Sequence, residues 1–151
     1  MKKLLVIIAV SLSLSVSAAG IKIKKAIKAG NAKVNAELAN VKTACGNAEL
    51  EVSVDWAKWE SYKLDASKHE TTIGYAATLV VNEVLGNMIE ACKDADYKEA
   101  IAEVKKVVVS GKDNFSDTYI DFKYADGTLN ATLNGDGYGS WKNKDLFMAI
   151  W

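Results

Sequence analysis

The longest regular pattern of apolar positions in the chain lies between residues 20 and 46. Apolar or small residues recur there every three or four positions, with the lysines mostly between them: Ile23, Ile27, Gly30, Val34, Leu38, Val41 and Cys45. This spacing is typical of one face of an α-helix. Gly30 and Asn31 allow a bend in this helix, and Gly46 and Asn47 indicate its end. We therefore expect a long N-terminal helix.

The pattern changes after residue 48. Four apolar residues alternate with four polar ones, namely Leu50, Val52, Val54 and Trp56 with Glu49, Glu51, Ser53 and Asp55. A period of two predicts a half-buried strand whose acidic side chains face outward. Helical spacing returns from residue 71 and predicts a second helix, with the stripe Ile73, Ala77, Val81, Val84, Met88 and Cys92, widened by Leu85 and Ile89.

A third helix is expected from residue 96, because Asp96 and Glu99 have the spacing of a capping box. Its apolar side chains are Tyr97, Ile101 and Val104. The three valines at 107–109 have two interpretations. They extend this helix, or they open a strand, because β-branched residues favour sheets.

Residues 120–133 predict a β-hairpin. Asp126 and Gly127 are a strong signal for a two-residue turn. That turn would pair Ala125 with Thr128, Tyr124 with Leu129, Phe122 with Ala131 and Ile120 with Leu133. The large apolar side chains then share one face of the hairpin, and a shift of one residue would destroy this arrangement.

A short closing helix is expected near the C-terminus. Asp145 can cap it, and its apolar side would consist of Leu146, Phe147, Ile150 and Trp151. The elements together predict an α+β fold, with an antiparallel sheet of about four strands and helices packed on one face. Residues 19–151 have the length of a single domain and contain no internal repeat or linker-like run.

The first 18 residues have the pattern of a secretory signal peptide. Met1, Lys2 and Lys3 precede an apolar run at 4–10, and small residues follow at 16–19. Cleavage is expected after Ala18. A membrane anchor is the alternative, but it needs about 20 apolar residues, and serines interrupt this run. Because the first cysteine is Cys45, no lipid attachment is expected at the cleavage site, so the mature chain is predicted to be periplasmic or secreted, without a transmembrane span.

Two cysteines in an exported chain suggest a disulfide between Cys45 and Cys92. Both lie at the ends of apolar helical stripes, so the bond would join two helix ends. The alternative is a pair of buried free thiols. Neither state is catalytic, because the chain has no CxxC motif.

Charge is balanced overall but unevenly distributed. Removal of Lys2 and Lys3 leaves 17 of the 19 lysines against 19 acidic residues, which argues against nucleic acid as the main partner. Arginine, the usual bidentate ligand of phosphate, is absent. Four lysines near the start of the first helix can contact an anionic surface or form a solvated helix face: Lys22, Lys24, Lys25 and Lys28.

Catalytic patterns are weak. His69 is the only histidine, so sites that need two histidines are excluded, and no GxSxG elbow marks a catalytic serine. Paired carboxylates can hydrolyse sugars, but Asp55, Glu60, Asp117 and Asp121 have no diagnostic spacing. We therefore expect no catalytic residues and no cofactor.

The stretch Asn134-Gly135-Asp136-Gly137 resembles part of an EF-hand loop. In that register the loop would begin at Thr132 and end at Asn143, where calcium binding requires acidic residues. Neither Thr132 nor Asn143 is acidic, so we interpret the stretch as a turn and expect no metal.

Aromatic residues are the remaining candidates for a site. Trp56 continues the apolar side of the first strand and is expected in the core. Partial exposure and a role in an interaction surface are expected for Trp59, Tyr62, Tyr138 and Trp141. The sequence thus favours an exported, non-catalytic module that binds a protein, polymer or small ligand of the cell envelope. The alternatives are a small hydrolase that uses carboxylates or His69, and a structural envelope protein without a small ligand.

Overall fold

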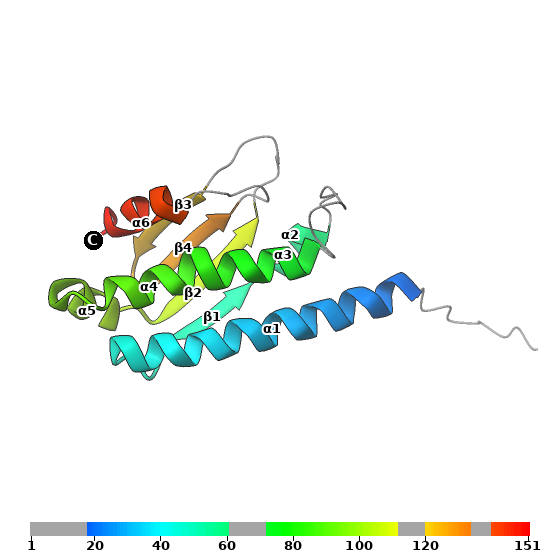
Figure 1. The fold of residues 1–151 in the computed structure, drawn as a ribbon, viewed down its shortest axis with the longest axis horizontal. Helices are drawn as coiled ribbons and strands as arrows, with labels where there is room; N and C mark the ends of the chain where they lie inside the picture. The colour runs from blue at the N-terminus through cyan, green and yellow to red at the C-terminus, as the bar shows by residue number, and fades with distance from the viewer. Residues whose placement is uncertain (1–17, 61–71, 112–119, 134–139) are drawn as a thin grey trace, which may run out of the picture.

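The computed structural model describes residues 18–60, 72–111, 120–133 and 140–151 (Figure 1). The elements in chain order are α1 (Ala18–Cys45), β1 (Glu51–Val54), α2 (Trp56–Glu60), α3 (Thr72–Leu79), the π-helix η1 (Val80–Leu85), α4 (Gly86–Ala91), α5 (Ala95–Ala102), β2 (Lys106–Gly111), β3 (Ile120–Ala125), β4 (Thr128–Leu133) and α6 (Ser140–Met148). The α+β class and the long N-terminal helix are confirmed.

The described strands form one four-stranded sheet in the order β1-β2-β4-β3. β1, β2 and β4 are parallel, and only β3 runs antiparallel to its neighbour β4. The prediction of an antiparallel sheet is therefore wrong. The chain between β1 and β2 contains several helices, and such a long connection can return the chain to the end at which β1 began. The alternation within a strand reports which face is buried but not the direction of the neighbouring strand.

The predicted β-hairpin is confirmed. β3 and β4 pair as Ala125 with Thr128, Tyr124 with Leu129, Phe122 with Ala131 and Ile120 with Leu133. Asp126 and Gly127 have φ angles of 50° and 74°. Two consecutive positive φ angles are the mark of the tight turn that Asp-Gly sequences favour. The valines at 107–109 lie in β2, which decides between their two interpretations.

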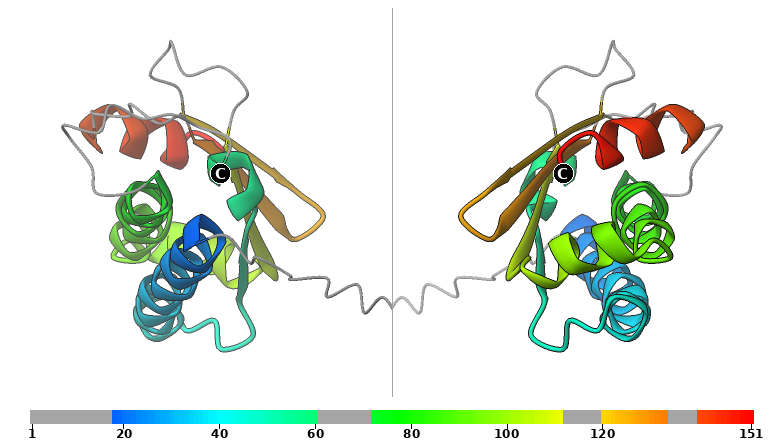
Figure 2. Two further views of the ribbon diagram at one scale, coloured as in Figure 1. Left: turned by 90° about the vertical axis from the view of Figure 1, so that its right-hand side faces the viewer. Right: turned by 90° about the vertical axis from the view of Figure 1, so that its left-hand side faces the viewer.

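Helices cover one face of the sheet, as Figure 2 shows. The covered face presents the buried side chains Val107, Val109, Phe122, Leu129, Ala131 and Leu133 to the helices. The opposite face is mostly polar along β2, β3 and β4, with Lys106, Lys123 and Asn130 exposed and Val108 half-buried. This division explains the alternation of apolar and polar residues in the hairpin.

The second predicted helix is divided into α3, η1 and α4. The expected stripe holds at Ile73, Ala77, Val84 and Met88, which are buried, but Val81 is only half-buried. Val81 lies inside the π turn, whose wider winding changes the helical phase at this position. In the next helix, the Asp94 carboxylate accepts a hydrogen bond from the Asp96 amide at 3.0 Å. The cap is thus two residues before the predicted one.

The closing helix begins earlier than expected. α6 starts at Ser140, so Asp145 lies within it and is not its cap. Phe147 is buried with its ring edge-on to Phe122, at a centroid distance of 5.3 Å. Leu146 is 50% exposed, so its place on the apolar side was wrongly predicted. Leu146 and Phe147 differ in burial because adjacent residues of a helix point about 100° apart.

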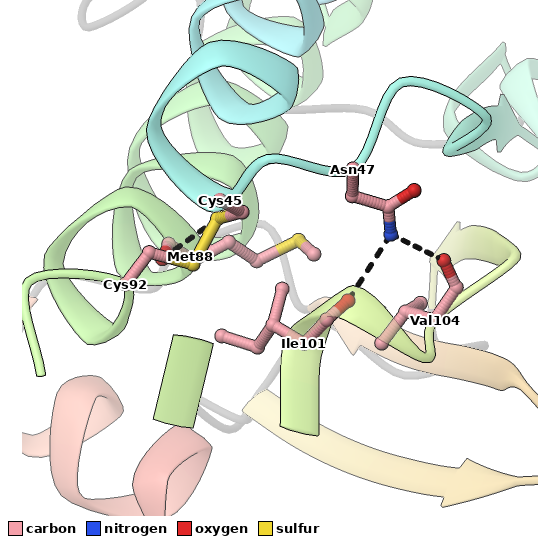
Figure 3. The surroundings of a disulfide bond; sticks show 6 residues. All are labelled: Cys45, Asn47, Met88, Cys92, Ile101 and Val104. Carbon is pink, nitrogen blue, oxygen red and sulfur yellow. Dashed lines mark hydrogen bonds between the residues drawn. A yellow bond between two sulfur atoms is a disulfide. The ribbon is translucent and has the colours of Figure 1, made fainter. Parts of the chain in front are cut away.

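A disulfide confirms the predicted link between Cys45 and Cys92 (Figure 3). It joins the C-terminal end of α1 to the residue after α4, and both sulfurs belong to buried residues. Cys45 Sγ lies 3.7 Å from Met88 O. This is a van der Waals contact, because a bonded sulfur carries no hydrogen to donate.

Asn47 lies near the disulfide and connects the end of α1 to the end of α5 (Figure 3). Its side-chain amide donates to Ile101 O at 3.1 Å and to Val104 O at 2.7 Å. Ile101 lies in the last turn of α5 and Val104 lies two residues after the helix, and Ile101 O also accepts from the Val104 amide at 3.1 Å. Gly46, with a φ of 69°, lets the chain leave α1 in the left-handed conformation that ends many helices. The predicted end of α1 is therefore confirmed.

Candidate functional site

The N-terminal half of α1 extends beyond the other described elements. In Figure 1 its dark-blue start continues past the ends of α2 and α3. Among the described residues, α1 first packs against the core through Ala26 and Ile27, and its buried positions begin further on, with Gly30 and Val34. Among residues 20–25, four are exposed and two are half-buried: Ile21, Lys22, Lys24 and Lys25 are exposed, whereas Gly20 and Ile23 are half-buried.

One side of this segment carries a set of exposed residues that we call the basic face: Ile21, Lys22, Lys24, Lys25 and Lys28. A helix turns about 100° per residue, so these five positions fall within an arc of about 160°. Ile21 lies near the middle of the arc. The stripe that contains Ile27 and Val34 lies on the opposite side, facing the core. The basic face therefore points away from the body of the protein.

A contact at the middle of α1 fixes the base of this segment. The Trp56 indole N–H donates to Asn31 Oδ1 at 2.9 Å. The indole ring lies so close to Gly30 that a Cβ atom there would be 2.8 Å from Trp56 Cη2. Gly30 is thus required for close approach of a ring, whereas we had expected it to allow a bend. α1 continues through it as one helix.

The lysines of the basic face are unpaired in the part of the chain that the structure describes. The first turn of α1 contains no acidic residue. The nearest acid along the helix is Glu37, nine residues after Lys28, or about 13 Å along the axis. The helix dipole adds partial positive charge at this end. The segment is therefore a concentrated cationic surface.

The expected exposure of Trp59 is wrong. Trp59 is completely buried, and its ring lies 6.3 Å from that of Trp56, which is in the core as predicted. Residues 56–60 form the short helix α2, which turns Trp59 toward α3 and β2. Trp59 therefore cannot form a contact surface. Tyr62, Tyr138 and the side chain of Trp141 lie outside the described residues, so their role in an interaction surface stays a prediction.

The carboxylates considered for catalysis do not meet where the structure describes them. Asp55 follows β1 and Asp121 lies in β3, at opposite edges of the sheet. Three strand spacings separate these edges, or about 14 Å. Asp121 also forms an ion pair with Lys123 at 3.2 Å. His69, Asp117 and the side chain of Glu60 lie outside the described residues.

A second polar feature lies in the π-helix, a type of turn that is frequent at functional sites. Glu83 and Asn87 are both buried. The Asn87 side-chain amide donates to Glu83 O at 2.6 Å. A π turn disturbs the regular backbone hydrogen bonds, and this amide supplies a side-chain donor to a carbonyl within the turn. α6 packs against η1, so we assign the pair a structural role.

The remaining electrostatic features are on the surface. Just after the end of α4, the Lys93 ammonium hydrogen-bonds to the exposed Glu90 carboxylate of that helix at 2.6 Å and lowers the pKa of that carboxyl group. Across the described ranges, no group of three His, Cys, Asp or Glu side chains could hold a metal ion. The turn at 134–137 lies outside these ranges, so its failure to bind calcium stays a prediction.

No protein-family model, curated protein or solved structure matches this chain. Within the part of the chain that the structure describes, no helix combines the length and apolar content needed to cross a membrane.

Sequence reasoning found the lysines of the basic face but missed Ile21, which is 47% exposed. The signal was present, because Ile21 precedes Lys24, Lys25 and Lys28 by three, four and seven positions. These spacings put it on the lysine side of a helix. The contact of Gly30 and Asn31 with Trp56 could not be predicted from local spacing, because Trp56 is distant from them in the sequence.

Proposed function

We propose that the protein is an exported, non-catalytic binding module whose basic face contacts an anionic component of the cell envelope. The observation that supports this proposal is the group of exposed lysines at one end of α1, none of which forms an ion pair among the described residues. Cations held on a fixed scaffold bind an anionic surface without the entropy loss that a disordered segment would incur.

The proposed location outside the cytoplasm has two supports. The disulfide between Cys45 and Cys92 is consistent with an oxidising compartment. The first 18 residues have the composition of a signal peptide, although residues 1–17 lie outside the described part of the chain. Intact-mass measurement of the exported protein should show that residues 1–18 are missing. A retained Met1 would contradict the proposed processing.

The expected affinity is modest. A lysine close to an anionic surface contributes about 1 kcal/mol, so four contribute about 4 kcal/mol, or a dissociation constant of about 1 mM. Several molecules bound to one surface, or additional contacts, would strengthen this attachment. Because salt screens exposed charges, binding should weaken steadily as ionic strength rises.

A soluble polyanion tests the charge requirement. Binding of the exported protein to dextran sulfate should be measured with Lys24, Lys25 and Lys28 each changed to Gln. Glutamine removes the charge but is also a good helix former. Loss of the three lysine charges should weaken the free energy of binding by about 3 kcal/mol, which lowers the affinity roughly 100-fold.

The matched control has Lys98, Lys106 and Lys144 changed to Gln, which are exposed lysines of the body. It changes the net charge by the same amount, so it should retain most of the binding. Equal losses in the two variants would show that net charge alone governs binding. No measurable binding by the wild-type protein would overturn the proposed function and leave a structural envelope protein as the favoured alternative.

A further inference from the structure

We infer that the anionic component is a lipid bilayer, and that Ile21 enters its interfacial region while the four lysines of the basic face contact lipid headgroups. This inference rests on the proposed function, because it names the surface that the same face binds. It also predicts that the apolar side chain of Ile21 contributes to binding, whereas purely electrostatic binding would not depend on this side chain.

The position of Ile21 distinguishes a bilayer from a soluble polyanion. A single exposed apolar residue is ordinary on a protein surface. Ile21, however, is 47% exposed at the centre of a cationic arc, with lysines on both sides. A bilayer offers negative headgroups and apolar chains within a few ångströms of each other, which suits an apolar side chain surrounded by cations. A soluble polyanion offers no apolar layer for Ile21.

The shape of the molecule allows a flat surface to reach this face. α1 forms the lower margin of the molecule in Figure 1, and its dark-blue start stands clear of the sheet. The core-facing stripe lies opposite the basic face, so the body of the protein lies on the other side of α1. A bilayer can therefore lie along the basic face without meeting the strands.

The mode of attachment is peripheral. One isoleucine and four lysines give weak, reversible binding, and the lysine stems can lie along the apolar layer while their ammonium groups remain with the headgroups. Neutral lipid should bind weakly, because it lacks the attraction that brings Ile21 to the surface.

Vesicle co-sedimentation of the exported protein tests the inference. The vesicles contain phosphatidylcholine alone or phosphatidylcholine mixed with phosphatidylglycerol, and dextran sulfate serves as the lipid-free polyanion. Ile21→Ser should reduce binding to the phosphatidylglycerol vesicles roughly tenfold, through loss of the apolar contact. Its binding to dextran sulfate should stay at the wild-type level, because no charge has changed.

Leu146→Ser is the matched control. Leu146 is 50% exposed but lies on α6, away from the basic face. The variant removes a similar apolar surface and should bind both ligands like the wild type. Circular dichroism melting should show that both variants remain folded, because both side chains are exposed.

The outcomes separate the inference from the proposed function. Vesicle binding that requires phosphatidylglycerol and falls in Ile21→Ser alone supports the inference. Binding to dextran sulfate without binding to vesicles overturns the inference and leaves the proposed function intact. Equal vesicle binding by wild type and Ile21→Ser does the same, because the contact would then be purely electrostatic. Failure to bind either ligand overturns both.

Discussion

The two halves of α1 belong to one continuous helix but differ in what surrounds them. In the C-terminal half, Val34, Val41 and Cys45 are fully buried or nearly so, and the disulfide to Cys92 joins this end to α4. In the N-terminal half, the basic face is exposed, and the described contacts with the core come from Ala26 and Ile27 and, at the end of this half, from Gly30 and Asn31. One half is therefore part of the core, and the other is a surface.

The comparison shows that the apolar stripe of a helix does not by itself determine burial. The stripe continues from Ile23 to Cys45 through both halves. The contact of Trp56 with Gly30 and Asn31 marks the point after which neighbouring elements cover α1. Burial requires a partner, and the partners of α1 come from segments far along the chain.

The largest expected effect concerns the C-terminal half of α1. Replacing both Cys45 and Cys92 by Ser should lower the free energy of unfolding by about 4 kcal/mol, because the bond closes a loop with a sequence separation of 47 residues. Urea unfolding of the oxidised protein and the double variant measures this difference. The reduced wild type is the control and should resemble the variant. A loss below about 1 kcal/mol would show that the corner is held without the covalent bond.

At the junction of the two halves, Gly30→Ala should destabilise the protein by about 2 kcal/mol, because the added methyl group overpacks against the Trp56 ring. The same substitution in a Trp56→Ala background should instead stabilise the protein by about 1 kcal/mol, through the higher helix propensity of alanine. Thermal or urea unfolding of the four proteins gives both values. The same sign in both backgrounds would refute the assigned role of Gly30.

A smaller effect is expected from the hydrogen bond at this junction. Trp56→Phe removes the indole N–H that donates to Asn31, together with the distal indole ring that lies against Gly30. The hydrogen bond itself is expected to contribute about 1 kcal/mol. A double-mutant cycle with Asn31→Ala isolates this bond from the change in ring size. Independent effects of the two substitutions would mean that the bond contributes nothing to stability.

The smallest effect is expected in the N-terminal half. Changing Lys24 and Lys25 to Gln should alter the free energy of unfolding by less than about 0.5 kcal/mol, because both side chains are exposed and unpaired in the described structure. A slight gain is expected, since positive charge near the start of a helix opposes its dipole. Calorimetric unfolding at low salt is the most sensitive measurement. A loss above about 1 kcal/mol would place these lysines in a structural contact and remove the contrast between the two halves.

The predicted exposure of individual side chains was less accurate than the predicted elements. Trp59 was placed on the surface because its sequence neighbours are polar, yet α2 turns it completely into the core. Leu146 was placed in the core on helical spacing, yet it is half-exposed. Both errors concern residues in short helices, where a shift of one position changes the direction of a side chain by about 100°. The lysines of the basic face were identified correctly as exposed because a charged side chain rarely leaves water unpaired.

The sequence by itself determined the features that depend on neighbouring residues. The Asp126-Gly127 turn and the alternation beside it set the register of β3 and β4, and Gly46 set the end of α1. Only the tertiary structure decided the features that depend on distant residues: the parallel direction of β1, β2 and β4, the burial of Trp59, and the emergence of α1 from the core. The physical reason is one of range. Backbone conformation follows from local sterics and hydrogen bonds, whereas burial and strand direction depend on which distant segments the folded chain brings together.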